Sequence, residues 1–196
     1  MFGPAIKVIK TMDKFSAVAK RLEDLQKINV MVGVPEDESP RQGNATITNA
    51  QLAFLHERGY KAPKWAVMNA YQARYGNMKG KKRALKALNA YLMSKGSPWF
   101  NVPARPFLEP AIKANMPTIL KIQKRILHTA LDGKPVTAEV NALGLFAQSK
   151  VKGWFTDPRN NWAPNHPLIV KLKGSDRPLI DTAQLLNSIH YVVDRK

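Results

Sequence analysis

The sequence has few side chains of the types that catalyse reactions or bind metals. It contains no cysteine, which excludes disulfide bonds, thiolate metal sites, iron–sulfur clusters and a cysteine nucleophile. Its histidines are His56, His128, His166 and His190. No two of them have metal-ligand spacing, and His56-Glu57 lacks the second histidine four residues later that a zinc-protease helix requires. We therefore predict no metal site and interpret the histidines as structural or surface residues.

Two further patterns are too incomplete to indicate an active site. Residues 76–82 resemble a phosphate-binding loop in part, but the spacing is one residue short and no Ser or Thr follows the lysine. Asp176 and Asp181 are close in sequence, but two acids near a turn usually serve as a helix cap and a solvated charge. No Gly-x-Ser-x-Gly nucleophile elbow is present. We predict no catalytic residue, no cofactor and no enzymatic activity.

The strongest chemical signal is a basic segment, residues 60–101. The chain has 31 Lys and Arg against 14 Asp and Glu, a formal net charge of +17. Nine of the basic residues, and none of the acidic ones, lie in these 42 residues. The aromatic residues interleaved with them are Trp65, Tyr71, Tyr75, Tyr91, Trp99 and Phe100. Such an excess of positive charge predicts a polyanionic neighbour.

Three interpretations of the basic segment stay open. Its lysines contact phosphates while its rings stack or pack on nucleic acid. Alternatively, it is an amphipathic hairpin whose rings form a core and whose lysines are solvated. In the third interpretation it is an arm that docks on an acidic protein. The residues that we predict to face DNA or a partner are Lys79, Lys81, Lys82, Arg83 and Lys86.

Hydrophobic spacing predicts the elements that must position these residues. Apolar residues recur at helical spacing, as at Phe15, Val18 and Leu22, and short β-branched runs indicate strands. The predicted helices are residues 11–27, 50–58, 65–75, 83–94, 106–131, 137–151 and 183–188, and the predicted strands are residues 28–34 and 191–193. Residues 76–80 are the hinge of a helical hairpin. The predicted fold is α+β, a small mixed or antiparallel sheet packed by helices, with the basic helical hairpin as an insertion.

Polar residues predict where several of these helices begin. Asn49, Thr137 and Asp181 are expected to cap the helices that follow them, and Gly59 to end the helix 50–58. Residues 153–178 are rich in Gly, Pro, Asn and Trp, and we predict a long irregular segment there.

Prolines predict the path between the basic segment and the next helix. Pro103 and Pro106 hold the chain extended, and Pro106 then starts a helix because proline is tolerated in the first turn. We expect Pro110 and Pro117 to kink or divide that helix.

The length and composition predict one domain with one insertion. The 196 residues suffice for a single core. We place an α+β domain at residues 1–59 and 102–196 and the basic helical insertion at 60–101. No apolar run reaches the ~18–20 residues that span a bilayer, so we expect a soluble protein of cytosolic origin.

Three segments occur in an order typical of one family. The first is the strand 29–35 (Asn-Val-Met-Val-Gly-Val-Pro). The second consists of residues 50–59 (Ala-Gln-Leu-Ala-Phe-Leu-His-Glu-Arg-Gly) together with residues 102–108 (Val-Pro-Ala-Arg-Pro-Phe-Leu). The third is residues 178–189 (Pro-Leu-Ile-Asp-Thr-Ala-Gln-Leu-Leu-Asn-Ser-Ile), which Tyr-Val-Val follows at residues 191–193. This order resembles the neck or tail-completion proteins of tailed bacteriophages, also called virion morphogenesis proteins. The resemblance covers most of the chain outside residues 60–101.

The chain departs from the family pattern in two places. In the family, His-Glu-x-Gly usually lies close in sequence to Pro-x-Arg-Pro-Phe, and Pro-Leu-Ile-Asp-Thr-Gly-x-Leu-x-x-Ser-Ile follows near the C-terminus. Here residues 60–101 separate the first two motifs. Ala183 replaces the glycine of the third, which puts a glycine-dependent turn in question.

The resemblance implies a structural role. It implies an α+β fold and assembly of the chain with itself into a six- or twelve-fold ring at the head–tail junction, as a neck, collar or tail-completion protein. The implied partners are the portal or connector, the tail terminator, sheath or tube proteins, and packaged DNA in the channel, with no membrane. The implied location is the neck or tail region of the virion, after assembly in the host cytoplasm. It implies no catalysis.

We also predict the residues at the interface between subunits. They are Arg105, Pro106, Phe107, Trp154 and Trp162. Arg105, held between prolines beside Phe107, would form a rigid anchor for a neighbouring subunit. The other interpretation of residues 103–108 is a plain junction between a loop and a helix.

Two alternatives to the ring remain. The chain is a stand-alone nucleic-acid-binding protein, or it is an enzyme whose catalytic residues lie far apart in sequence. The salt dependence of DNA binding separates the first alternative from a ring component.

Overall fold

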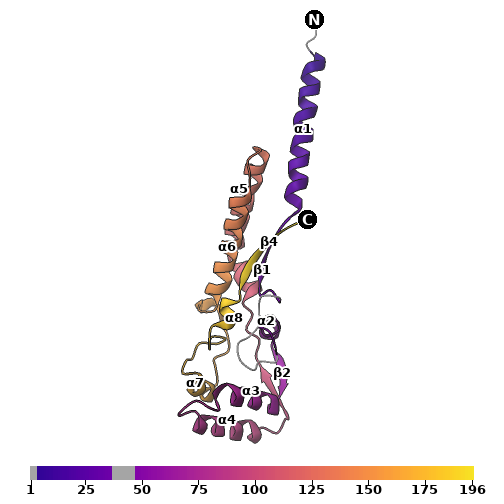
Figure 1. Ribbon diagram of the computed structural model, residues 1–196. Helices are drawn as coiled ribbons and strands as arrows, with labels where there is room; N and C mark the ends of the chain where they lie inside the picture. Colours follow the sequence, from indigo (N-terminus) through magenta and orange to yellow (C-terminus); the bar gives the residue numbers. More distant parts are fainter. Residues whose placement is uncertain (1–3, 37–46) are drawn as a thin grey trace. The chain divides into compact units, whose positions relative to one another are not determined.

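Helices and short strands alternate along the computed structural model, which describes residues 4–36 and 47–196, with side chains from residue 15 onward (Figure 1). The chain divides into two compact units. Unit 1 comprises the chain up to Gly33, Ile112–Lys150 and Tyr191–Lys196. Unit 2 comprises Val34–Ala111 and Val151–His190, so the whole basic segment lies within it. The predicted α+β class is confirmed.

Unit 1 packs a two-stranded sheet against two helices. Helix α1 (Pro4–Gln26) leads into β1 (Ile28–Gly33), which pairs with the antiparallel strand β4 (His190–Arg195). The helices are α5 (Leu108–Leu131) and α6 (Thr137–Trp154), whose residues 112–131 and 137–150 belong to this unit. The core residues are Ile119, Ile126, Val140 and Leu143.

One glycine lets strand β4 approach helix α6. A Cβ on Gly144 would overlap the ring of Tyr191, so no larger residue fits there unless the ring moves. The backbone N–H of Tyr191 also donates to Oε1 of Gln148 at 2.9 Å. These contacts fix the start of β4 on α6 within unit 1.

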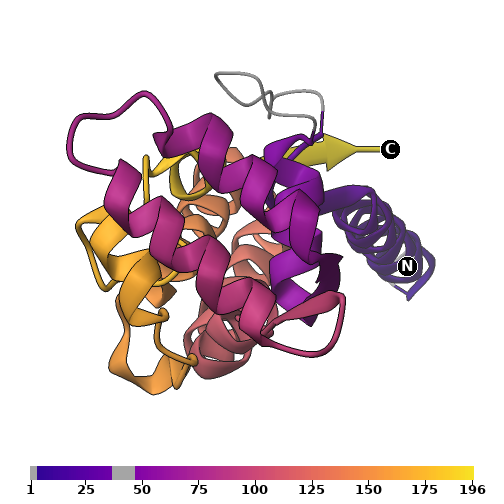
Figure 2. The same cartoon turned by 90° about the horizontal axis from the view of Figure 1, so that it is seen from below.

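Unit 2 is built on a β-ribbon and a helical hairpin. Its elements are α2 (Asn49–Arg58), β2 (Tyr60–Pro63), α3 (Lys64–Tyr75), α4 (Lys82–Ser94), β3 (Trp99–Val102), the short 3-10 helix η1 (Pro158–Asn160), α7 (Pro167–Lys173) and α8 (Gln184–Asn187). Strands β2 and β3 are antiparallel, with Tyr60 opposite Val102 and Pro63 opposite Trp99. Figure 2 shows α3 and α4 side by side, as the predicted hairpin requires. The two ends of the basic segment therefore meet in a ribbon.

The core of unit 2 explains most of the aromatic residues of the basic segment. Leu85, Leu88 and Leu92 of α4 recur at helical spacing and are buried together with Tyr75 of α3 and Leu172 of α7. The partly buried residues packed on this cluster include Tyr71, Tyr91 and Phe100. These rings pack on the core, whereas Trp65 and Trp99 of the same segment are 66% and 52% exposed.

Several predicted boundaries are wrong, each for a local reason. Thr48, rather than Asn49, caps α2: its hydroxyl accepts from the N–H of Gln51, whose side chain bonds back to Thr48 in a capping box. Helix α5 begins at Leu108, after Pro106, and continues through Pro117 without dividing.

The C-terminal third of the chain is more ordered than predicted. The segment 153–178 contains η1 and α7, and Leu172 of α7 is fully buried. Asp181 does not cap α8; its carboxylate accepts from Nε of Arg74 at 3.1 Å. Residue Ala183 occupies the cap position, with no side-chain hydrogen bond. The single small sheet of the prediction is replaced by two separate two-stranded sheets.

Ala183 holds the conformation that favours glycine. Its φ of 57° is left-handed, where a Cβ costs about 1–2 kcal/mol. We expect Ala183→Gly to raise the free energy of unfolding by about 0.5–1 kcal/mol, since the added entropy of the unfolded chain offsets part of the gain. Urea unfolding measures this. The matched control is Ala114→Gly, on the exposed face of α5, which should lower the free energy of unfolding by about 1 kcal/mol. If both variants lowered this free energy equally, the prediction would be contradicted.

The buried tyrosines of unit 2 predict alkaline instability. Burial raises the pKa of Tyr71 to about 12, and burial together with the carboxylate of Asp181 raises the pKa of Tyr75. In the unfolded chain both phenols ionise near pH 10. Stability from these groups is therefore complete below about pH 10 and is lost as the pH rises toward 12. Urea unfolding across that range should show the loss, and the double variant Tyr71→Phe/Tyr75→Phe should flatten it. An unchanged slope in the double variant would contradict this account.

Within residues 4–36 and 47–196, no helix combines the length and apolar character needed to cross a membrane.

Candidate functional site

The two motifs separated by the basic segment meet in unit 2. The carboxylate of Glu57, at the end of α2, accepts hydrogen bonds from the backbone N–H groups of Phe107, Leu108 and Glu109 at 2.8, 3.3 and 3.2 Å. The N–H of Arg105 donates to the carbonyl of His56 at 2.7 Å. Glu57 thus caps the first turn of α5, where free N–H groups favour a negative charge.

Gly59 allows this contact. It has a φ of 71°, and a Cβ there would lie 2.7 Å from the N atom of Ala104 and 3.0 Å from the carbonyl oxygen of Val102. Both are backbone atoms that cannot rotate away. The glycine of the His-Glu-x-Gly motif is therefore required because the chain returning at residues 102–104 passes directly over it.

The predicted interface residues lie mostly inside unit 2. Phe107 is fully buried, and the centroid of its ring lies 4.9 Å from that of Phe155. The ring of Phe155 in turn packs edge-on against Trp162, with 5.6 Å between the centroids. The indole N–H of Trp162 donates to the carbonyl of Pro106 at 3.0 Å. Trp154 is also buried. Phe107, Trp154 and Phe155 thus belong to the core, and the half-buried Trp162 packs on Phe155 at its edge.

Arg105 is buried as well, and its side chain is held by the residue that follows Trp162. Its Nε and Nη2 atoms donate to the carbonyl of Ala163 at 3.3 and 2.9 Å, and burial lowers its pKa. The side chains of Arg105, Phe107 and Trp154 therefore have little exposed surface through which to contact a neighbouring subunit, and their role in a subunit interface stays a prediction. Pro106 and Trp162 remain half-buried.

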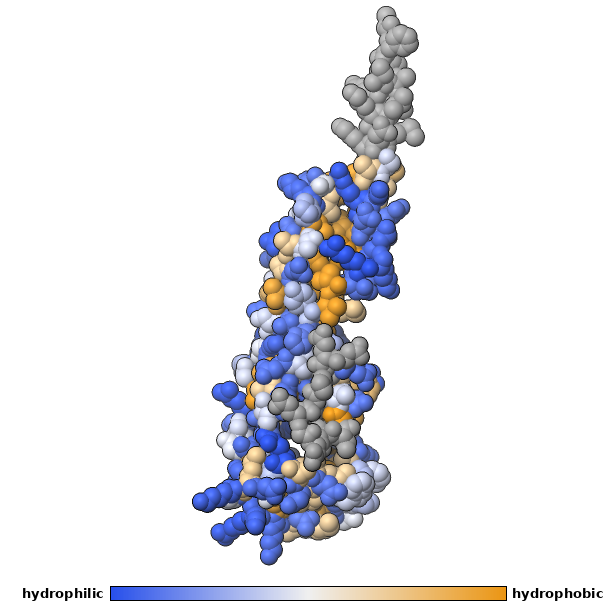
Figure 3. Space-filling view, in the orientation of Figure 1, coloured by the Kyte–Doolittle hydropathy of each residue, from blue (hydrophilic) through white to orange (hydrophobic). Residues whose placement is uncertain are grey.

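A basic hollow lies where the helical hairpin meets α7. We use this name for the depression, about 680 Å³ in volume, that is lined by Lys79, Gly80, Lys81, Arg83, Ala84, Ala87, Leu168 and Lys171. The lining contains four cationic side chains and no carboxylate. The ammonium of Lys81 donates to the carbonyl of Lys171 at 3.0 Å, which ties the hinge of the hairpin to α7. Figure 3 shows long hydrophilic side chains on the outer surface of the hairpin.

The structure separates the predicted basic residues into two groups. Lys79, Lys81 and Arg83 line the basic hollow, whereas Lys82 and Lys86 are exposed on α4 outside its lining. Sequence analysis missed Lys171, which lies 88 residues beyond Arg83. The signal that could have found it is the pair Leu168 and Leu172, whose spacing fits one face of a short helix packed on α4.

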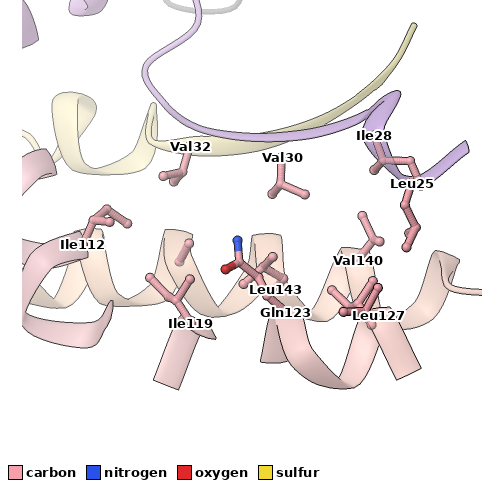
Figure 4. A pocket seen from close by; sticks show the side chains of 12 residues that line it. Leu25, Ile28, Val30, Val32, Ile112, Ile119, Gln123, Leu127, Val140 and Leu143 are labelled. Atoms are coloured by element: carbon pink, nitrogen blue, oxygen red, sulfur yellow. The ribbon is translucent and has the colours of Figure 1, made fainter. Parts of the chain in front are cut away.

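Unit 1 has an apolar groove of its own. Its volume is about 330 Å³, and Gln123 is the sole polar residue in its lining. Figure 4 shows Val30 and Val32 of β1 facing Ile119 and Leu143 of the helices across this space. In Figure 3, apolar surface gathers between α1 and α5.

The described residues contain no group of three His, Asp or Glu side chains placed to hold a metal ion. Comparison with protein-family models, with curated proteins and with solved structures finds no match to this chain.

Proposed function

We propose that this chain is a structural virion protein of a tailed phage, and that it forms a ring at the head–tail junction which joins the connector to the tail around the DNA channel. The observation that carries the proposal is the junction at Glu57. Two motifs that lie close in sequence in the neck and tail-completion proteins are separated by 42 residues here, yet Glu57 bonds directly to residues 107–109. The two ends of the basic segment thus lie next to each other in space, as is expected of a segment inserted between the two motifs.

The third motif supports the same proposal. Helix α8, which lies within residues 178–189, contacts α2. Asp181 of this motif pairs with Arg74 of α3. Residues 50–59, 102–108 and 178–189, the parts of the resemblance beyond Val34, therefore lie in one compact unit, although they span more than 130 residues of sequence.

The proposed mechanism is binding without turnover. A six-fold ring of chains with a net charge of +17 carries +102 formal charges, which repel each other unless counter-charge comes from DNA or acidic neighbours. The portal or connector on one side, and the tail terminator, sheath or tube on the other, are the proposed protein partners.

The mass of the purified protein in solution tests the proposal. Light scattering should give about 131 kDa for six copies of 21.9 kDa, or about 263 kDa for twelve, and negative-stain images should show rings. Nuclease treatment and ~1 M salt, where the Debye length falls to about 3 Å, serve as controls because they disperse aggregates held by DNA or by charge alone. Monomers both in solution and in virions would contradict the ring.

The basic hollow favours a second candidate, a nucleic-acid-binding protein that acts alone. Such a protein should stay monomeric and bind duplex DNA with a Kd of about 1–100 μM at physiological salt, weakening steeply between about 50 and 200 mM salt. The mass measurement distinguishes it from the ring.

A further inference from the structure

The basic hollow gathers positive charge without neutralising it. In the part of the chain that the structure describes, no carboxylate lies within ion-pair distance of Lys79, Arg83 or Lys171. The ammonium of Lys81 donates to the carbonyl of Lys171, which places this charge at the wall of the hollow. Like charges around a concave surface focus a positive potential into it. The arrangement is stabilised when an anion enters.

The lining limits what that anion can be. No aromatic ring contributes to it, so bases have no surface on which to stack. Gly80, Ala84 and Ala87 are small and keep the hollow open, and its volume lies within the ~300–1,000 Å³ typical of ligand sites. Lys and Arg are main donors to phosphate oxygens, and such contacts position a nucleic acid without reading its sequence.

The surroundings favour a repeating polyanion. Lys82 and Lys86 continue the positive charge along the exposed face of α4 beyond the hollow. These two charges raise the positive potential around the hollow and attract a polyanion, whereas the phosphate contacts are left to the residues that line the hollow. The apolar residues of the lining are Ala84, Ala87 and Leu168, of which two are small, so the hollow offers little to anchor a large side chain of an acidic protein segment.

We propose that the basic hollow binds the phosphodiester backbone of duplex DNA, without reading base sequence, and that Lys79, Arg83 and Lys171 make the phosphate contacts. The proposal rests on the proposed function, since it assigns the DNA of the channel to a defined site. It also divides the basic residues of the hairpin into those that touch DNA and those that do not.

The test compares two double variants with equal loss of charge. Lys79→Gln/Arg83→Gln removes two contacts from the hollow, and Lys82→Gln/Lys86→Gln removes two charges outside it. Binding of a short labelled duplex is measured by fluorescence anisotropy from about 50 to 200 mM salt, with the fold of each variant checked by circular dichroism. The slope of log affinity against log salt should become shallower by about 1.8 in the hollow variant, two contacts at about 0.9 each, and should not change in the control.

A second readout uses the unaltered protein. Lysine acetylation followed by mass spectrometry should show that the duplex protects Lys79 and Lys171 but leaves Lys82 and Lys86 reactive. Duplexes of different sequence should bind equally.

The outcomes separate this proposal from the ring. Equal changes in both double variants, or no binding of the duplex at about 50 mM salt, overturn the hollow as a DNA site whatever the mass of the protein. If poly-glutamate bound more strongly than the duplex, and Lys79→Gln/Arg83→Gln weakened that binding, the site would bind an acidic protein and the DNA proposal would be overturned. A monomeric protein that shows the expected difference between the variants contradicts the ring and keeps the site.

Discussion

Replacing Phe107 by alanine is expected to lower the free energy of unfolding by about 3–5 kcal/mol, the largest effect of a single substitution that we predict. The ring is fully buried and lies 4.9 Å from that of Phe155, so truncation leaves a cavity inside unit 2. Aromatic pairs of this kind add about 0.5–1.5 kcal/mol beyond the area that they bury. Urea unfolding followed by circular dichroism measures the change.

Phe54→Ala is the matched control for Phe107→Ala. Phe54 also lies in unit 2, but 58% of it is exposed, so its loss should cost less than about 1 kcal/mol. If Phe107→Ala left unfolding unchanged and instead reduced the mass of the assembly, Phe107 would be an interface residue after all and the core assignment would be wrong.

Replacing Glu57 by alanine is expected to lower the free energy of unfolding by about 3 kcal/mol. The substitution removes the acceptor of three backbone N–H groups at the start of α5. A hydrogen bond to a charged group contributes about 1.5–3 kcal/mol net, and the sum here is smaller because the three bonds are partly or fully exposed and water can replace them. It also releases the end of α2 from the segment that follows β3. Thermal or urea unfolding would detect the loss.

Glu57→Gln separates the charge of this cap from its geometry. An amide oxygen can still accept from one or two of the N–H groups, so we expect about half of the loss. Asp132→Ala is the control: its carboxylate pairs with Lys134 at 3.4 Å on an exposed surface, and its loss should stay within about 0.5 kcal/mol. Equal stability of Glu57→Ala and the control would show that the N–H groups find water instead.

Local patterns predicted the helices well where the buried residues of a helix recur at helical spacing. In α4, Leu85, Leu88 and Leu92 fall on one face, and that face is buried. The strand at residues 28–34 was predicted from its short run of β-branched residues, and in the structure Val30 and Val32 point to one side of β1. The alternation of apolar residues within a single element is a property of that element alone, so the sequence states it directly.

Predictions failed where a distant segment supplies the partner. Helix α7 was predicted as irregular because it is short and lies in a segment rich in Pro and Gly, and a helix of that length depends on the packing of Leu168 and Leu172 against α4. Asp181 has the sequence position of a cap, but Arg74, 107 residues away, competes for its carboxylate. The ribbon between β2 and β3 joins strands of four residues each, too short to be recognised without each other.

The candidate site shows the same division. The sequence by itself determined that the positive charge concentrates in residues 60–101, that this segment forms a helical hairpin, and that no cysteine is available for chemistry, because these depend on composition and local spacing. Only the tertiary structure decided that Arg105 and Phe107 are buried, that Lys171 joins Lys79, Lys81 and Arg83 in one hollow, and that Glu57 caps α5. Burial and convergence of charge depend on contacts between residues far apart in the chain, and such contacts leave no periodic signal in either partner.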